Sequence, residues 1–439
     1  MESREIIPFA LGERNKGCLN QILGAFKALA DLTGQQYDSD RLFMLPENVS
    51  NVGDMKEAFF YSQFESYEVF RRKIFEMADA YFQKTNFIPK VFITVYNPTE
   101  SRNAAEDSDM LCRAVKEYYK EHNLGNIFTA ILTSRLHRYK YADMINVPKH
   151  LMTFRSRIRL LQHKGLRKRI LITIGTINNF DQKTVNAKYR QLLKTIAKDD
   201  DNAVVQGQLE KLRKFKAADK KVVLCLGGRV EGTEIIFGLK YAQNLLNDAE
   251  RLSRCGYGVV FVNGPRTPND VTDFLYEKTR SNPNITFQNS KKIAADEEER
   301  SPKNWRIYSG KYEDDFRALQ KIGNIYPGIL GFGNTLAVHT MDSYSGCETA
   351  NAAIRTAISG RGLDIDPVAR YDCYNLQKLL CPKYAVDWDD FVKMACNLRI
   401  EPKNLTLQVL SSPLRIFAET VLNRLNNARR PHKRQSSAD

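Results

Sequence analysis

The chain of 439 residues is long enough for two or three domains, and 43% of it is hydrophobic and 10% aromatic. This composition is typical of globular proteins and excludes a largely disordered chain. No run of about 18 apolar residues occurs, so we expect no membrane-spanning helix. The N-terminus lacks the basic lead and long apolar core of a secretory signal peptide.

The net charge of +15 favours a polyanionic partner: a nucleic acid, a phosphorylated small molecule or an acidic membrane surface. Seven of the sixteen residues of 154–169, interpreted as a loop, are Lys or Arg, and the C-terminal tail holds five more. We expect these segments either to be solvated or to contact a protein partner or an anionic membrane. No zinc finger, basic zipper or RNA-binding aromatic signature accompanies them, which makes nucleic acid the weakest option.

The eight cysteines include no C-x-x-C pair, and the six histidines include no H-x-x-x-H pair. Scattered cysteines in apolar runs are typical of reduced thiols. We therefore expect a cytoplasmic protein, with a peripheral position at a membrane as an open alternative. The spacing predicts no metal site.

Helical spacing of apolar residues marks 18–34, and aromatic-rich amphipathic sequence predicts a helical insert over 35–86. Runs of β-branched and aromatic residues then predict strands at 90–96, 126–134, 141–148 and 169–178. Helical patterns alternate with them, as in "MLCRAVKEYYKEH" and "QKTVNAKYRQLLKTIAKDD". Such alternation predicts a parallel sheet with helical crossovers.

The polar and charged segment 199–220 is interpreted as the transition from a helix to an interdomain linker, after which the alternation restarts. Further strands are predicted in "KVVLCLGG", "YGVVFV", "NITFQN" and "TLAVHTMD". The predicted fold class is therefore α/β, with two doubly wound parallel-sheet domains. Its parts are an N-terminal domain at 1–200, a C-terminal domain at 218–405, a last helix at 406–425 and a basic disordered tail at 426–439.

Two strand ends in the second half carry residues suited to phosphate, and ligands of open parallel sheets bind outside the carboxyl ends of the strands. Gly227 and Gly228 let backbone N–H groups approach an oxyanion, and Arg229 adds positive charge. The next strand end is a turn fixed by prolines. It supplies Gly264, Arg266 and Thr267.

A third strand end, "VHTMDSYSGCETA" at 338–350, places small hydroxyls at the junction between a predicted strand and a predicted helix. The helix is predicted to begin near Ser345–Glu348, where free N–H groups and the helix dipole favour an anion. Glu348 is either a partner of that dipole or an acceptor for the hydroxyls of a ribose. A diphosphate beside a ribose is a nucleotide, so the three strand ends together predict a nucleotide-sugar site.

These residues resemble the mitochondrial-fission "elongated mitochondria" family of plants and bacteria. That family has a strand ending in Gly-Gly, an Arg-Thr-Pro turn and a signature close to V-V-T-x-D-S-x-S-M-x-S-E-A. The segment 338–350 matches the signature at Thr340, Asp342, Ser343, Ser345, Glu348 and Ala350. It departs from the signature at His339, Gly346 and Cys347.

The N-terminal half resembles the family less closely. Its P-G-H-x-N-Q-x-L-G opening is matched at Gly17, Asn20, Gln21 and Gly24, with Cys18 in place of histidine. Its D-x-x-x-x-P-x-H-D motif is kept at Asp143, Pro148 and His150, with Leu151 in place of the last aspartate. Its T-x-G strand end is kept at Thr173 and Gly175, whereas its Gly-Arg-Arg strand end is not recognisable near residue 97.

The resemblance implies a GT-B-like fold, with two domains facing across a cleft and a nucleotide-activated sugar in the C-terminal one. In this type of fold the last helix, here at 406–425, is expected to cross back onto the N-terminal domain. It implies metal-independent glycosyl transfer, no tightly bound cofactor, and a nucleotide-sugar or nucleoside diphosphate as ligand. The general base would come from the N-terminal side, where His150 and Glu13 are the candidates. The acceptor side would be lined by Gly17, Asn20, Gln21 and Gly175.

The departures from the family lie in the acceptor domain, which leaves a second hypothesis open. The chain would then be a non-catalytic adaptor or regulator that binds a dynamin-related GTPase, as the family's plant members do, or a membrane surface. The sequence does not decide between a glycosyltransferase and an adaptor, and it names neither the base nor the sugar nor the acceptor.

Overall fold

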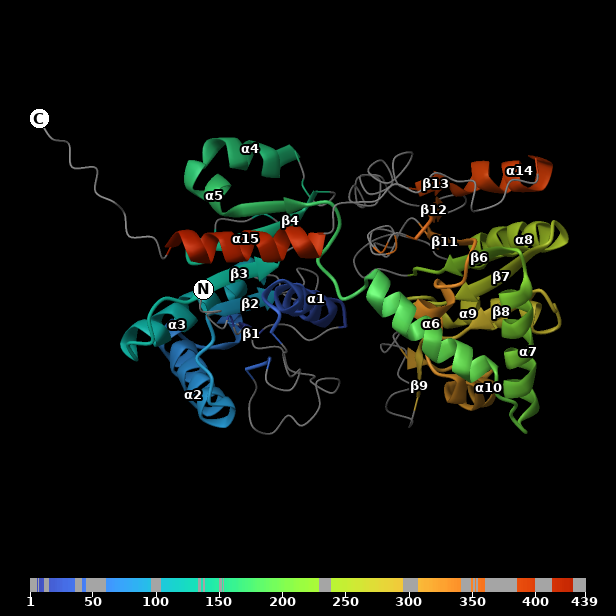
Figure 1. Cartoon of the computed structure of the whole chain (residues 1–439), viewed down its shortest axis with the longest axis horizontal. Helices are drawn as coiled ribbons and strands as arrows, with labels where there is room; N and C mark the ends of the chain where they lie inside the picture. The colour runs from blue at the N-terminus through green and yellow to red at the C-terminus, as the bar shows by residue number, and fades with distance from the viewer. Residues whose placement is uncertain are drawn as a thin grey trace, which may run out of the picture. The chain divides into compact units, whose positions relative to one another are not determined.

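The computed structural model describes residues 6, 8–11, 16–35, 42–44, 61–95, 104–132, 136, 139–149, 152, 154–228, 238–294, 307–340, 349, 352, 354–359, 385–398 and 413–428. The chain divides into two compact units (Figure 1). The first unit comprises Met1–Asn179 and Ser411–Asp439, and the second comprises Phe180–Leu410. None of the helices described is both long and apolar enough to cross a membrane.

The first unit is built on a five-stranded, fully parallel sheet in the order β1-β2-β3-β4-β5. The strands are β1 (Pro8–Ala10), β2 (Val91–Val95), β3 (Phe128–Leu132), β4 (Met144–Pro148) and β5 (Ile170–Thr173). Phe43 forms a parallel bridge to Ala10. Because β2 already pairs with Ala10, Phe43 must lie on the other side of β1. Chain segments therefore flank β1 on both sides.

Helices cover both faces of this sheet. They are α1 (Lys16–Thr33), α2 (Tyr67–Thr85), α3 (Ala104–Glu121), α4 (Phe154–Gln162), α5 (Lys164–Arg169), α15 (Pro413–Ala428) and the short η2 (Tyr61–Gln63). Strand β2 shows the two layers, because Val91 and Ile93 join the core under α1 and α15, whereas Phe92 joins the core under α2 and α3. The helices α1 and α15, from opposite ends of the sequence, lie side by side (Figure 1).

The second unit is built on a six-stranded parallel sheet in the order β13-β12-β11-β6-β7-β8. The strands are β6 (Lys220–Cys225), β7 (Tyr257–Val262), β8 (Ile285–Gln288), β11 (Thr335–Thr340), β12 (Thr356–Ser359) and β13 (Ala385–Asp387). Read from β8 and numbered along the chain, this order is 3-2-1-4-5-6. The order in which strands are added to the sheet therefore reverses between β6 and β11, and sheets of this order bind their ligands at that point.

The helices of the second unit are α6 (Gln182–Ile196), α7 (Ala203–Ala217), α8 (Leu239–Arg254), α9 (Asn269–Arg280), α10 (Glu313–Leu319), η4 (Gln320–Ile322), α11 (Tyr326–Ile329) and α14 (Trp388–Leu398). Two short strands, β9 (Lys292–Ile293) and β10 (Ile307–Tyr308), pair with each other. A single hydrophobic core joins these elements to the sheet. The predicted fold class, two doubly wound parallel α/β domains, is confirmed for each unit taken by itself.

The structure corrects the prediction of a linker at 199–220, because most of that segment is the helix α7. The side chain of Asn202 caps the helix by accepting hydrogen bonds from the N–H groups of Val204 and Val205. Leu209, Leu212 and other apolar residues at helical spacing are buried in the second core. The first unit therefore ends at Asn179 rather than near residue 200, since α6 and α7 both contribute to the hydrophobic core of the second unit.

One other segment differs from its prediction, because residues 154–169 form the helices α4 and α5, not a loop. The helical prediction for 35–86 is confirmed over its second half, which is α2. Phe70 and Ile74 of α2 are fully buried, so this helix is part of the core of the first unit. The last helix spans Pro413–Ala428 and packs on α1 and β5, whereas residues 429–439 lie outside the described part.

Candidate functional site

The strongest candidate site lies at the carboxyl edge of the second sheet, where β6 and β11 end next to each other. Gly227 and Gly228 follow β6, and Thr340 ends β11. The N–H group of Gly227 donates a hydrogen bond to the Oγ1 atom of Thr340, at 2.7 Å. The two strand ends are therefore joined at the point where the direction of the chain reverses.

The turn after β7 closes on the same point. The Oγ1 atom of Thr267 donates to the carbonyl oxygen of Gly227 at 2.6 Å and accepts from the N–H group of Gly264 at 3.0 Å. Gly228 lies so close to this turn that a Cβ atom there would be 1.9 Å from the carbonyl oxygen of Arg266. Only glycine allows this approach. The structure thus brings Gly227, Gly228, Gly264, Arg266, Thr267 and Thr340 together, as the sequence predicted.

The other predicted ligand residues of this unit lie outside the described residues. They are Arg229, Asp342, Ser343, Ser345 and Glu348. Thr349, the residue after Glu348, is described and is fully buried. Its Oγ1 atom lies 3.0 Å from the Nε2 atom of His339 and 3.0 Å from the Oγ1 atom of Thr356. The chain is therefore held to β11 and β12 at the residue that follows Glu348.

The role of His339 was not predicted, because the sequence marks this residue only as a departure from the family signature. It is completely buried, and burial lowers its pKa to about 3, so the imidazole is neutral at pH 7. Its Nδ1 atom has no hydrogen-bond partner in the described structure. A neutral, buried imidazole next to Thr340 is suited to holding Thr349 in place rather than to binding an anion directly.

Lys291 is a residue of the site that the sequence analysis missed. Its Nζ atom donates to the carbonyl oxygen of Thr267 at 2.9 Å and to the Oδ1 atom of Asn269 at 2.6 Å. The side chain is buried, which lowers its pKa to about 8, although the nearby Asp270 and Asp273 act in the opposite direction. The polar run "NSKK" directly after β8 was the signal, because β8 ends at the same edge of the sheet.

These groups together can receive an anion. The hydroxyl of Thr340, which accepts from Gly227 and keeps its own proton to donate, the half-buried Arg266 and the buried ammonium of Lys291 carry positive or donor character. The N–H groups of Gly227 and Gly264 and the hydroxyl of Thr267 instead hold the strand ends together. A carboxyl-terminal edge at a reversal of strand order is where such groups converge on a ligand in this type of sheet. Among the described residues, no cluster of His, Cys, Asp and Glu could hold a metal ion.

In the first unit, part of the predicted acceptor side is described. Asn20 is exposed and Gln21 is half-buried on α1, which includes Gly17. A Cβ atom at Gly24 would lie 2.3 Å from the carbonyl oxygen of Asn178, so α1 touches the loop after β5. That loop contains Gly175, whose φ is +87° and whose carbonyl accepts from the hydroxyl of Thr173 at 2.9 Å.

The predicted catalytic residues His150 and Glu13 lie outside the described residues. The structure therefore gives no geometry for a general base. What it describes of the acceptor side is a contact between α1 and the loop after β5, at the carboxyl edge of the first sheet.

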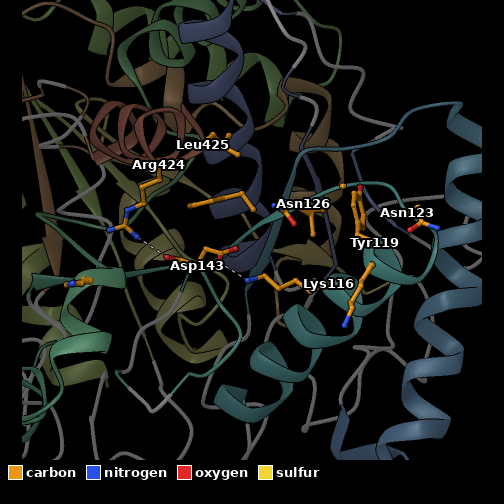
Figure 2. A pocket seen from close by; sticks show the side chains of 12 residues that line it. Lys116, Tyr119, Asn123, Asn126, Asp143, Arg424 and Leu425 are labelled. Atoms are coloured by element: carbon orange, nitrogen blue, oxygen red, sulfur yellow. Dashed lines mark hydrogen bonds and ion pairs between the residues drawn. The ribbon is translucent and has the colours of Figure 1, made fainter. Parts of the chain in front are cut away.

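A hollow of about 890 Å³ lies at the opposite edge of the first sheet, where β3 and β4 begin (Figure 2). Its charged lining is mostly basic and consists of Lys116, Lys120, Lys168, Arg424 and one carboxylate, Asp143. The sequence analysis did not predict this hollow, because its lining comes from segments that are far apart along the chain. It lies at the amino ends of the strands, away from the edge where open sheets bind ligands.

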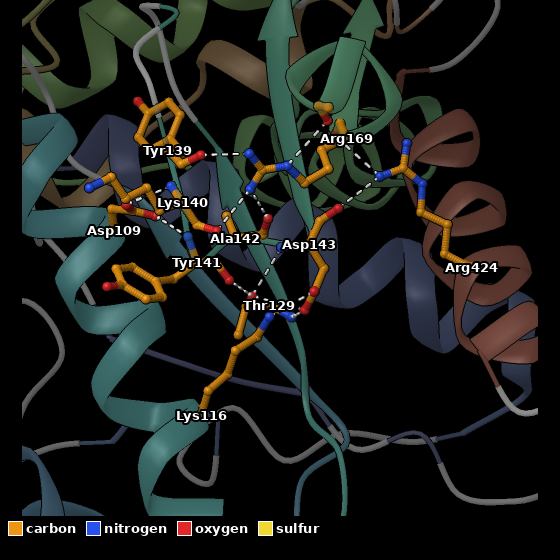
Figure 3. Close-up of polar contacts among 11 residues, drawn as sticks. Asp109, Lys116, Thr129, Tyr139, Lys140, Tyr141, Ala142, Asp143, Arg169 and Arg424 are labelled. Atoms are coloured by element: carbon orange, nitrogen blue, oxygen red, sulfur yellow. Dashed lines mark hydrogen bonds and ion pairs between the residues drawn. The ribbon is translucent and has the colours of Figure 1, made fainter. Parts of the chain in front are cut away.

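Asp143, which matches the family motif, connects several elements beside this hollow through its hydrogen bonds (Figure 3). Its carboxylate accepts from the Nζ atom of Lys116 at 2.7 Å and from the N–H group of Thr129 at 2.8 Å. Arg424 of α15 donates to the backbone carbonyls of Asp143 at 3.0 Å and Arg169 at 3.1 Å. These contacts fasten α15 to the starts of β4 and β5, so we interpret Asp143 as supporting the fold.

No family model matches the sequence, and no curated protein matches it significantly. The chain is similar over its length to several solved structures. The UDP-GlcNAc 2-epimerase from Neisseria meningitidis bound to UDP-GlcNAc is 10% identical, with 96% of this chain and 100% of that chain covered and a TM-score of 0.43. The α,α-trehalose 6-phosphate synthase from Burkholderia multivorans is 12% identical, with 84% and 73% covered and a TM-score of 0.33. Because these TM-scores are below 0.5, they assign neither an activity nor a ligand to this chain.

Proposed function

We propose that the second unit binds a nucleoside diphosphate or a nucleotide-activated sugar at the carboxyl ends of β6 and β11. The observation that carries this proposal is the convergence of Gly227, Gly228, Thr267 and Thr340 at the reversal of strand order. The diphosphate would lie against the glycine-rich strand end, with Lys291 supplying positive charge from behind the turn that contains Arg266 and Thr267.

We further propose that Glu348 accepts hydrogen bonds from the ribose. Its neighbour Thr349 is held by contacts to His339 of β11 and Thr356 of β12. With the diphosphate and ribose bound in this way, the sugar would be transferred to an acceptor in metal-independent glycosyl transfer. Donors aimed at the departing diphosphate stabilise the charge that develops on it in the transition state.

The alternative is that the same site binds a nucleotide without turnover and that the chain is an adaptor or regulator of the mitochondrial-fission type. The two functions share the nucleotide site and differ only in the chemistry. Nucleotide binding must therefore be measured before activity, and any ligand that binds is then tested for sugar hydrolysis and transfer.

The test is calorimetric titration of the whole protein with UDP, GDP, ADP and the corresponding nucleotide-sugars. We expect one of them to bind, and Glu348→Ala to weaken its binding about ten- to a hundredfold, since a charged hydrogen bond contributes about 1.5–3 kcal/mol. Thr340→Val should weaken binding as well, because it removes the acceptor for Gly227. The control is Glu210→Ala, which removes an exposed carboxylate from α7.

Two results would contradict the proposal. One is the absence of binding by any of these ligands at millimolar concentration. The other is equal binding by wild type and by both site variants. Binding without any hydrolysis or transfer would instead favour the adaptor over the transferase.

A further inference from the structure

The helices α4 and α5 form a basic surface of the first unit. The sequence 154–169 contains seven Lys and Arg residues and no Asp or Glu. Two of the seven serve the fold, because Arg169 donates to the carbonyls of Tyr139 and Ala142 and Arg159 donates to that of Leu136. The others make no ion pair with the described part of the chain and are exposed: Arg155, Arg157, Lys164, Arg167 and Lys168.

The same surface carries exposed apolar side chains. Phe154 is 73% exposed, Ile158 36% and Leu161 74%. Their spacing of four and three residues places them in one stripe along α4. Arg155 and Arg157 are turned about 100° and 60° away from Phe154 on opposite sides, by the 100° step of an α-helix, so they flank the stripe.

The inner side of α4 is what attaches it to the protein. Leu160 packs against the core of the first unit, and no residue of α4 is fully buried. Leu166, which is buried, attaches α5. The apolar stripe is therefore not the face that holds the helix in place, and its exposure needs a different reason.

We propose that α4 and α5 dock on the surface of a bilayer that contains anionic phospholipids. Phe154, Ile158 and Leu161 enter the boundary between headgroups and acyl chains, and the flanking cations contact lipid phosphates. An apolar stripe bordered by Arg and Lys is the pattern of helices that lie in this interface. The positive surface continues from α5 into the hollow at the amino edge of the sheet, which Lys168 also lines.

The charge and the stripe together favour a bilayer over other polyanions. A nucleic acid would use the cations but would leave the exposed phenylalanine and leucine in water. An anionic bilayer satisfies both, because basic residues are attracted to its surface and apolar side chains leave water as they enter it. This docking is independent of whether the second unit binds a nucleotide.

The experiment is flotation of the full-length protein with vesicles of phosphatidylcholine alone and of phosphatidylcholine with 30% phosphatidylserine. We expect binding to the anionic vesicles only, and its loss in 1 M salt, where charges are screened within about 3 Å. Arg155→Gln/Arg157→Gln should reduce partitioning more than about tenfold, at roughly fivefold for each cation. Phe154→Ser/Leu161→Ser should reduce it at least about tenfold.

Two matched controls separate this surface from general effects. Arg190→Gln/Lys194→Gln removes the same charge from exposed positions on α6, and Leu32→Ser/Leu239→Ser removes exposed leucines elsewhere. Both should bind like the wild type, and all variants should keep its thermal unfolding temperature. Absence of vesicle binding, equal binding to neutral vesicles, or equal loss in the controls would overturn the proposal. Binding to RNA or an acidic protein without vesicle binding would overturn it as well.

Discussion

At the scale of single residues, the candidate site of the second unit is held together by buried polar groups that are hydrogen-bonded to one another. Thr267 and Thr340 both engage Gly227, so the strand end after β6 is fixed by side chains from two other strand ends. Lys291 fixes the turn after β7 from behind. If the proposed nucleotide binds here, these hydrogen-bonded strand ends do not need to be ordered first.

His339 makes the stability of the second unit depend on pH. Its pKa is lowered to about 3 in the folded protein, against about 6.5 when unfolded, so below pH 6.5 the unfolded chain binds a proton that the folded chain does not. The contribution of neutral His339 to the free energy of unfolding is therefore complete above pH 6.5. It is lost as the pH falls toward 3, by at most about 1.4 kcal/mol per pH unit.

We therefore predict that the free energy of unfolding falls more steeply between pH 7 and pH 4.5 in the wild type than in His339→Phe. Denaturant unfolding followed at several pH values measures this difference. Parallel pH profiles for the two proteins would show that His339 does not titrate as a buried group.

At the scale of elements, α7 shows how a helix can be hidden in a charged sequence. Its buried residues recur at helical spacing, but charged residues fill the positions between them and lower the mean hydropathy of the segment. The sequence pattern of this segment therefore predicts a linker rather than a buried helix. The helix is stabilised by the packing of its apolar face, including Leu209 and Leu212, against the second sheet.

Gly207 lies inside α7, and a Cβ atom there would meet nothing within 4 Å. We predict that Gly207→Ala stabilises the second unit by about 1 kcal/mol, because alanine favours a helix interior over glycine by that amount. Thermal or denaturant unfolding measures it.

Gly256→Ala is the matched control for this prediction. Its Cβ atom would also meet nothing within 4 Å, but its φ is +83°, so alanine should destabilise by about 1–2 kcal/mol. The same sign for both variants would contradict a helix at Gly207.

At the scale of the whole molecule, the two units differ in how many stretches of chain build them. The second unit is one stretch of chain, whereas the first is completed by α15 from the C-terminal end. Phe417, Ala418 and Val421 of α15 are fully buried in the core shared with α1. The first unit therefore depends on residues more than two hundred positions away from its sheet.

We predict that Phe417→Ala destabilises the first unit by about 3–5 kcal/mol, the usual cost of removing a buried phenylalanine. Calorimetry should show a lowered transition for that unit, with the transition of the second unit unchanged. Asn423→Ala, at an exposed position of the same helix, should leave both transitions in place. A shift of both transitions by Phe417→Ala would mean that the units unfold together.

The sequence by itself determined strands β2 to β8 and β11, the parallel α/β class, and the glycine and threonine positions of the candidate site in the second unit, whereas the short edge strands β1, β12 and β13 were not predicted. The predicted features follow from short-range information: β-branched runs form buried strands, and glycines and small hydroxyls mark strand ends. The candidate ligand residues on separate strands could be grouped because parallel strands share one carboxyl edge.

Only the tertiary structure decided the rest. It placed Lys291 against the turn at Thr267, defined the contacts of α15 with α1 and β5, and showed that 154–169 is an exposed amphipathic helix pair. Each of these depends on which distant segment covers a residue, and burial is a property of the packed fold rather than of the local pattern. The free energy that fixes α7, α15 and Lys291 comes from those long-range contacts.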